Sequence, residues 1–253
     1  MLCHFPYSKG RNFYTFGKNL ELKGKLFLIP TPLGDIDKEM VMPAGTLNAF
    51  ADIAFFAVEE LKTARRYLSA CGFKGRIDSL TLYELNEHTV DGHINEYLTP
   101  LLEGNNMGLL SEAGLPAVAD PGSRLVELCH ENDIDVIPLT GPSSIFLALM
   151  ASGKNGQNFS FNGYLPVKSE LRKAKLKELE RLSATKDQSQ IFIETPYRNN
   201  AILEDILSVC NPSTKLTIAC NITLKDEFIK TKRIADWKKE RPDLNKKPAV
   251  FII

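Results

Sequence analysis

The sequence predicts an α/β protein with a parallel-sheet N-terminal domain and a mixed-sheet C-terminal domain. Short apolar runs alternate with segments of helical period through the first half of the 253 residues. Strands that are separated by helices of this length pair in parallel. Several later strands follow one another without an intervening helix, which indicates a mixed sheet. The length is enough for one large domain or two of ordinary size.

Five strands and three helices are expected in the first half of the chain. The strands are short apolar runs, and the helices carry apolar residues three and four positions apart. Gly72 and Gly104 supply helix stops. The expected strands cover residues 25–30, 52–59, 79–84, 106–111 and 134–139, and the expected helices cover residues 61–72, 90–104 and 122–133.

The pattern restarts after the segment LTGPSS, where Pro142 stands in the first turn of an expected helix that Gly153 ends. Further helices are expected at residues 168–184 and 199–210, and strands at residues 159–165, 189–195, 215–222, 227–234 and 248–253. We therefore place the domain boundary near Leu139. This divides the chain into an N-terminal extension (1–24), an N-terminal α/β domain (25–138) and a C-terminal α/β domain (139–253).

The composition is typical of a soluble globular protein, with 43% hydrophobic and 25% charged residues. No apolar run approaches the ~18–20 residues that span a bilayer, so no membrane partner is expected. Residues 1–24 lack the basic and apolar regions of a secretory signal. The five cysteines are odd in number and form no CxxC pair, which favours reduced thiols and a cytoplasmic location.

The formal net charge is zero, but the two halves differ in sign. Residues 1–138 carry 12 basic and 19 acidic side chains, and residues 139–253 carry 19 basic and 12 acidic ones. Such asymmetry favours a polyanionic partner for the basic half, although Lys-rich surface helices would give the same count. The basic stretches are Lys168, Arg172, Lys173, Lys175 and Lys177, and Lys230, Lys232, Arg233, Lys238 and Lys239.

Several common signatures are missing from the chain. No GxGxxG follows an expected strand, and GxxxxGK[ST], HExxH and GxSxG do not occur. His88 and His93 lie five positions apart, with no further side chain at the spacing of a metal ligand. We therefore expect neither a standard Rossmann nucleotide site nor a metal site.

Three loops that follow expected strands are rich in Gly, Pro and Ser: PTPLGD (30–35), SEAGLPAVADPG (111–122) and TGPSS (140–144). Ligands of open parallel sheets bind beyond the carboxyl ends of the strands. Proline stiffens such loops, and glycine lets the backbone approach a ligand closely. Each loop alone is as well explained as a tight turn, but three together favour a composite pocket.

Six segments occur in an order that resembles the motif series of bacterial 16S ribosomal RNA (cytidine-2′-O)-methyltransferases, within the tetrapyrrole methylase superfamily. The resemblance covers about residues 25–235. It implies two α/β domains with S-adenosylmethionine in the cleft between them, and a homodimer. The segments are PTPLGD, VEELKTARRYL, SEAGLPAVADPG, LTGPSSIFLALMASG, FSFNGYLPVK and IFIETPYR.

The resemblance also implies site residues. Pro32 and Gly34 would form the floor of the cofactor site. The other implied cofactor residues are Ser111, Glu112, Ala113, Gly114 and Pro116 along the cofactor, and Pro142, Ser143 and Ser144 at the domain junction. Asp120 and Gly122 match an Asp-Pro-Gly turn, where an acid before a proline suits the N-cap of the next helix. We therefore expect Asp120 to be structural.

Transfer of a methyl group to a ribose 2′-hydroxyl benefits from a base, because the hydroxyl is a weak nucleophile. Candidate bases are Glu59, Glu60 and His88, and Lys62 or Arg65 would orient a phosphate. The two acids equally suit the N-terminus of a helix, where negative charge complements the helix dipole. A solvated helix face explains Arg65 and Arg66 as well as a phosphate contact does. Tyr164 and Tyr197 either stack on a base or pack in the core or at its rim.

The chain departs from the family pattern mainly where substrate is expected. Glu112 replaces Asp, Leu115 replaces Thr, Lys62 replaces Arg, and residues 220–224 lose the usual charges. The leading hypothesis is an S-adenosylmethionine-dependent methyltransferase that acts on a ribose 2′-hydroxyl of small-subunit ribosomal RNA. The alternatives are an enzyme of the same fold for a tetrapyrrole-like small molecule or a protein, and a non-catalytic module that binds S-adenosylmethionine.

Overall fold

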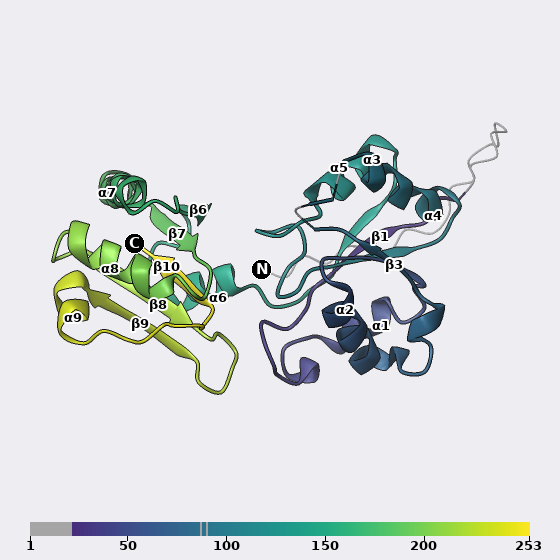
Figure 1. The fold of residues 1–253 in the computed structure, drawn as a ribbon, viewed down its shortest axis with the longest axis horizontal. Coiled ribbons are helices and arrows are strands. Elements are labelled where there is room, and N and C mark those ends of the chain that lie inside the picture. Colours follow the sequence, from purple (N-terminus) through teal and green to yellow (C-terminus); the bar gives the residue numbers. More distant parts are fainter. Residues whose placement is uncertain (1–21, 87, 90) are drawn as a thin grey trace, which may run out of the picture.

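The computed structural model describes residues 22–86, 88–89 and 91–253, and it contains two five-stranded sheets that lie in separate units (Figure 1). The chain leaves the first sheet at Pro138 and enters the second at Phe159. Most of the expected N-terminal extension, residues 1–21, lies outside the described residues.

All pairs of neighbouring strands in the first sheet are parallel, in the order β3-β2-β4-β1-β5. The strands are β1 (Leu26–Ile29), β2 (Phe55–Val58), β3 (Thr81–Glu84), β4 (Met107–Leu110) and β5 (Val136–Pro138). The central strand β4 is buried along its whole length, as expected for a strand covered on both faces. The predicted parallel N-terminal sheet is confirmed.

Helices cover both faces of the first sheet (Figure 1). On one face Leu98, Leu101, Leu125 and Leu128 pack on Leu109, and on the other face Phe50, Leu68 and Phe73 pack on Phe56. The helical elements are η1 (Lys38–Met40), α1 (Ala44–Ala49), α2 (Leu61–Leu68), η2 (Ser69–Phe73), η3 (Ile77–Ser79), α3 (Asp91–Ile94), η4 (Asn95–Tyr97), α4 (Leu98–Leu102) and α5 (Ser123–Glu131).

The second sheet is mixed, in the order β6-β7-β10-β8-β9, which confirms the prediction for the C-terminal half. β6 and β7 are parallel, and the other pairs are antiparallel. The strands are β6 (Phe159–Tyr164), β7 (Ser189–Ile193), β8 (Lys215–Cys220), β9 (Phe228–Arg233) and β10 (Ala249–Ile252).

Four helices flank this second sheet. The helices are α6 (Ser144–Ser152), α7 (Ser169–Lys186), α8 (Asn199–Val209) and α9 (Ile234–Lys239). α7, α8 and α9 pack on one face around Phe192, Trp237 and Phe251, whereas α6 packs on the other face through Ile145 and Leu149.

The helix expected at residues 90–104 is interrupted, because α3 passes through the 3₁₀ turn η4 before α4. Pro100 has no N–H to donate to the carbonyl of Glu96, so a regular α-helix cannot run through this position. The helix expected at residues 61–72 ends as α2 at Leu68 and continues as one π turn. The short helices α1 and α9 were not expected.

The parallel order has one consequence for function, because the carboxyl ends of β1 to β5 all lie at one edge of the sheet. Residues 30–35, 59–60, 111–122 and 139–143 follow β1, β2, β4 and β5 directly, so they gather at that edge. No helix within the described ranges is long and apolar enough to cross a membrane. The described cysteines, Cys71, Cys129, Cys210 and Cys220, form no disulfide.

Candidate functional site

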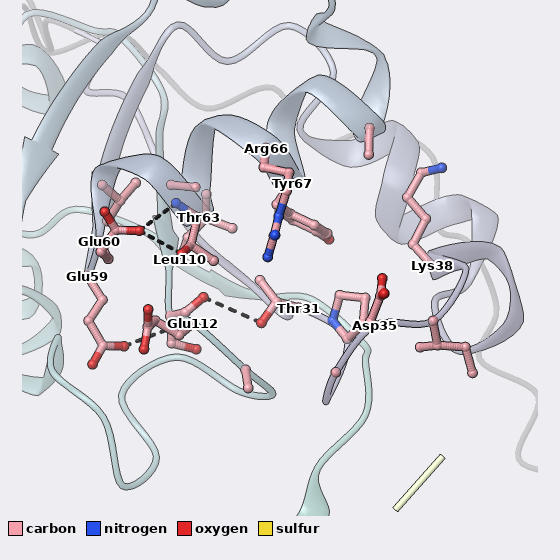
Figure 2. A pocket seen from close by; sticks show the side chains of 18 of the residues that line it. Thr31, Asp35, Lys38, Glu59, Glu60, Thr63, Arg66, Tyr67, Leu110 and Glu112 are labelled. Carbon is pink, nitrogen blue, oxygen red and sulfur yellow. Dashed lines mark hydrogen bonds between the residues drawn. The ribbon is translucent and has the colours of Figure 1, made fainter. Parts of the chain in front are cut away.

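Two pockets lie on either side of the loop that follows β4. The larger, of about 480 Å³, is bounded by residues 31–38, the start of α2 and residues 110–113 (Figure 2). The smaller, of about 100 Å³, is bounded by residues 113–120 and by side chains from the second unit, among them Tyr164 and Ile193. Ala113 lines both pockets, so this loop is the wall that they share.

The loop holds an unusual backbone. Four residues have positive φ angles: Gly114 (83°), Ala117 (63°), Ala119 (63°) and Gly122 (126°). Left-handed geometry costs an L-residue such as alanine roughly 1–2 kcal/mol. Gly114 is fixed by a pair of backbone hydrogen bonds with Thr31, of 2.9 and 3.1 Å. Strain of this kind collects where a ligand site requires a set backbone shape.

Close backbone approaches bring the three Gly/Pro-rich loops together. A Cβ on Gly114 would lie 3.2 Å from Leu33 Cδ2 and 3.7 Å from the carbonyl oxygen of Pro142. A Cβ on Gly34 would lie 2.8 Å from Leu224 Cδ1, so the first loop also touches the second unit. Leu224 therefore packs between the units, in the segment where the sequence lost its charges.

The residues expected to bind the cofactor divide between the two pockets. Pro32, Gly34, Ser111, Glu112 and Ala113 line the larger pocket. Ala113 also lines the smaller pocket, together with Gly114, Ser143 and Ser144.

Pro116 and Pro142 are buried behind these surfaces. They are not among the described residues that line either pocket. Both prolines can therefore stiffen the loops without reaching a ligand.

Glu60 is occupied as the N-cap of α2. Its Oε1 accepts a hydrogen bond from the Lys62 N–H (2.8 Å), and its Oε2 accepts bonds from the N–H and hydroxyl of Thr63 (both 2.6 Å) (Figure 2). These bonds, led by the Thr63 hydroxyl, hold the pKa of Glu60 below its ordinary value. A capping carboxylate with a lowered pKa is a poor proton acceptor, so the geometry favours the helix-start interpretation of Glu60.

Glu59 directly follows β2. It lines the larger pocket, and its Oε2 accepts a hydrogen bond from the Glu112 N–H at 3.2 Å (Figure 2). Lys62 and His88 are exposed and are not among the described residues that line either pocket.

Two neighbouring arginines of α2 face different surroundings. Arg66 lines the larger pocket, and its side chain reaches into it from α2 (Figure 2). Arg65 instead pairs with Asp78 at 3.4 Å on the surface. Arg66 is therefore the arginine of this pair that a pocket ligand could meet.

Asp120 is not the helix cap that the sequence predicted. Gly122 occupies the N-cap of α5, which has no side-chain cap bond, and Asp120 lines the smaller pocket. Burial and, after it, the charges of Glu59 and Glu112 together raise the pKa of Asp120 to about 6, against the opposing effect of the Ser111 hydroxyl.

The second unit adds another carboxylate to this region. Glu194 follows β7; its side chain is fully buried and pairs with Arg198 at 2.5 Å. Its Oε2 has no hydrogen-bond partner within the described part of the chain. Burial raises the pKa of Tyr164, and the charges of Asp120, Glu194 and Glu59 add to the rise while Arg198 opposes it. Carboxylates therefore gather near the junction of the two units, where Arg198 neutralises that of Glu194, and the remaining negative charge suits a cationic ligand.

The sequence carried a weak signal for these missed residues. Asp120 and Glu194 lie within the segments SEAGLPAVADPG and IFIETPYR, but nothing in either segment indicates that their acids face a common space. No cluster of three or more His, Cys, Asp or Glu side chains suited to a metal ion occurs among residues 22–86, 88–89 and 91–253.

A family model for Tetrapyrrole (Corrin/Porphyrin) Methylases matches residues 50–237. Ribosomal RNA small subunit methyltransferase I of Vibrio cholerae is 31% identical over 231 residues, which cover 90% of this chain and 76% of the relative. The protein of that name from Haemophilus influenzae is 31% identical over 236 residues, 92% of this chain and 79% of the relative. The crystal structure of the methyltransferase CobJ has the same fold, with a TM-score of 0.61 at 18% identity, and covers 90% of this chain and 93% of that chain.

Proposed function

This chain belongs to the tetrapyrrole (corrin/porphyrin) methylase family and is a methyltransferase, and from that premise we propose that it transfers a methyl group from S-adenosylmethionine to a ribose 2′-hydroxyl of small-subunit ribosomal RNA. Support for the acceptor comes from the relatives named as small-subunit ribosomal RNA methyltransferases. The observation that carries the proposal is the shared wall at Ala113, because a donor and an acceptor in the two pockets would meet there.

The methyl donor belongs in the smaller pocket. Its sulfonium is cationic and would face Asp120, the carboxylate that lines this pocket. The charge of Glu59 lies close enough to raise the pKa of Asp120, and that of Glu194 lies close enough to raise the pKa of Tyr164. Polar groups of Ser143 and Ser144, at the start of α6, would fix its polar atoms, and Gly114 would supply a close-fitting wall. The pocket of about 100 Å³ is below the ~300 Å³ of usual ligand sites, so the two units must open slightly when the donor binds.

The acceptor nucleotide belongs in the larger pocket, whose volume of about 480 Å³ lies within the range of ligand sites. Arg66 would hold a phosphate of the RNA by charge-assisted hydrogen bonds. The 2′-oxygen attacks the methyl carbon, the carbon–sulfur bond breaks, and the hydroxyl proton passes to Glu59. The products are a 2′-O-methyl ribose and S-adenosylhomocysteine. Alignment of the three atoms supplies most of the rate enhancement.

A homodimer is part of this proposal, and the outer face of α6 is its best candidate interface. Phe146 and Met150 stand one turn apart on α6 and are 54% and 77% exposed, while Ile145 and Leu149 fill the core beneath them. Exposed apolar neighbours of this kind mark protein interfaces. Light scattering tests this directly: wild type is expected at twice the chain mass and Phe146→Glu/Met150→Glu at the chain mass. A wild-type monomer would contradict it.

The function is tested with tritiated S-adenosylmethionine and small ribosomal subunits that lack ribose methylation. We expect label in the RNA, and we expect digestion to nucleosides to release it as a 2′-O-methyl nucleoside. Heat-denatured protein and large subunits serve as controls. If the protein binds the donor but transfers no label to RNA, the acceptor is wrong, and transfer to a small molecule of the tetrapyrrole class would replace it.

A further inference from the structure

Another concave surface lies at the far end of the second sheet, away from the two pockets. It is a groove of about 750 Å³ between the end of α6 (residues 152–154), the start of β8 at Lys215, the end of β9 (residues 231–233) and α9. We call this surface the basic groove. Five cations line it, Lys154, Lys215, Lys232, Arg233 and Lys239, together with two acids, Asp236 and Glu240.

Each acid of the basic groove already has a partner. Lys232 pairs with Glu240 at 2.6 Å, and Lys239 lies 3.9 Å from Asp236. The remaining cations, Lys154, Lys215 and Arg233, pair with no carboxylate in the described part of the chain. The basic groove therefore holds three positive charges that no carboxylate among the described residues neutralises.

The fold holds these three charges close together. Lys215 and Arg233 stand directly opposite each other in the antiparallel pair β8–β9. Lys154 Nζ donates a hydrogen bond to the carbonyl of Lys215 at 2.6 Å. Burial and the charge of Lys215 lower the pKa of Lys154 to about 8. Like charges directly opposite on a sheet are destabilising, so this arrangement is a cost that a bound anion would remove.

The other basic stretch of the C-terminal half differs. Arg172, which the sequence offered as an RNA contact, is 6% exposed; its Nε bonds to Asp205 at 2.7 Å, and its Nη1 bonds to the carbonyl of Val167 at 2.7 Å. Lys173 and Lys175 on α7 lie 3.4 Å from Asp205 and 3.0 Å from Glu178. Arg172 is thus structural, and much of the positive charge of α7 is neutralised.

We propose that the basic groove binds backbone phosphates of the RNA substrate at a distance from the site of methyl transfer. This inference rests on the proposed function. The methyl-donor site is acidic and repels phosphate, so an RNA substrate needs its main electrostatic contacts elsewhere. Lys154, Lys215 and Arg233 supply three uncompensated cations in a concave surface, which is what a folded phosphate backbone requires.

The groove lies within reach of an RNA that enters the larger pocket. β8 runs from Lys215 in the groove to Cys220, about 17 Å at ~3.3 Å per residue. Leu224, four residues further on, lies against Gly34 at the wall of the larger pocket. One RNA domain that spans this length can place a nucleotide in the pocket and its flanking phosphates in the basic groove.

The test compares two double variants that remove the same charge. Lys215→Gln/Arg233→Gln alters the basic groove, and Lys175→Gln/Lys177→Gln alters α7. Affinity for small ribosomal subunits is measured between 50 and 200 mM KCl. Each lost phosphate contact lowers the slope of log affinity against log salt by ~0.7–0.9, so the groove variant is expected to lose about 1.5 in slope. We expect it to bind about tenfold more weakly at 100 mM, whereas the α7 variant stays close to wild type.

A third variant separates binding from folding. Lys215→Glu places an acid opposite Arg233, so it is expected to raise the thermal stability while it weakens RNA binding. Binding of S-adenosylmethionine should be unchanged in all variants. If wild type methylates the subunits and the groove variants bind RNA equally well, the groove assignment is wrong and the proposed function stands. If wild type neither binds nor methylates RNA, both fall.

Discussion

Replacement of Asp120 by Asn removes one carboxylate from the smaller pocket with little change in size. The pKa of about 6 means that Asp120 is half protonated one pH unit below neutrality. A sulfonium at roughly 6 Å would stabilise the ionised form by about 3 kcal/mol at an effective dielectric of ~20. This equals about two pKa units, so donor binding would return the pKa of Asp120 to about 4.

The coupling between donor binding and the ionisation of Asp120 predicts the direction in which donor affinity changes with pH. Below pH 6 the donor must displace a proton, so the affinity of wild type for S-adenosylmethionine should fall about tenfold from pH 7 to pH 5. S-adenosylhomocysteine has a neutral sulfur and should show no comparable fall. Calorimetry with both ligands gives the ratio of their affinities, in which the shared contacts cancel. The ratio should change with pH in wild type and stay constant in Asp120→Asn. An equal fall for both ligands, or the same pH dependence in the variant, would refute the placement of the sulfonium beside Asp120.

The same substitution changes stability in a defined pH window. The folded pKa of Asp120 is raised above the unfolded value of about 3.9, so the folded state binds more protons between pH 4 and pH 6. Stability is therefore lost as the pH rises through 6. A shift of two units is about 3 kcal/mol, which partial exposure reduces to about 1 kcal/mol. Denaturant unfolding should show Asp120→Asn more stable by this amount at pH 7 and equal to wild type at pH 4, while Asp78→Asn on the surface changes little.

Three further substitutions test the loops and the acceptor pocket. Gly114→Val places a side chain at φ 83° and against Leu33, so calorimetry should show at least tenfold weaker binding of S-adenosylmethionine. Unchanged binding would show that Gly114 is not part of the donor site. Arg66→Ala should raise the KM for ribosomal subunits several-fold without a change in donor affinity. Arg65→Ala serves as the control, and an equal rise in KM for both variants would contradict the phosphate contact of Arg66. Ala119→Gly relieves left-handed strain of roughly 1–2 kcal/mol against an entropy cost of roughly 0.5–1 kcal/mol. Unfolding measurements should therefore show a free energy of unfolding higher by about 0.5 kcal/mol, together with weaker donor binding. A loss of stability would show that the strain is absent.

The first sheet was predictable because its strands are continuous apolar runs. The run at residues 106–111 became β4 (Met107–Leu110), and the helical segments between the runs enforced parallel pairing. The helices α1 and α9 were missed since each has only six residues, too few to show a helical period. For α9, the preceding strand pattern of residues 227–234 also hid the helix start at Ile234.

Asp120 shows what the sequence could not reveal about the site. Asp-Pro-Gly is typical of a helix start, and the pattern carries no information on the left-handed alanines that precede it. With Ala117 and Ala119 in that geometry, Asp120 lines the smaller pocket close to Glu59, which lies far away in the sequence. Neighbours of this kind follow from the order of strands in the sheet and not from spacing along the chain.

Arg172 shows the same limit for charge patterns. In the sequence it belongs to a Lys-rich helix and looks solvated, but a buried Asp205 on α8 binds it in the structure. Lys154, Lys215 and Arg233, by contrast, come from three separate segments and gather in one groove. A count of charges predicted the basic half, but only the fold shows which of them are neutralised.

Methyl transfer as proposed requires a donor and an acceptor that meet at Ala113, with the donor in the smaller pocket. A crystal structure of the protein with S-adenosylhomocysteine tests this most directly. We predict that the ligand lies between residues 113–120 and Tyr164, with its sulfur directed toward Ala113 and the larger pocket left open. A ligand that lies entirely in the larger pocket, or that binds at neither pocket, would contradict the account.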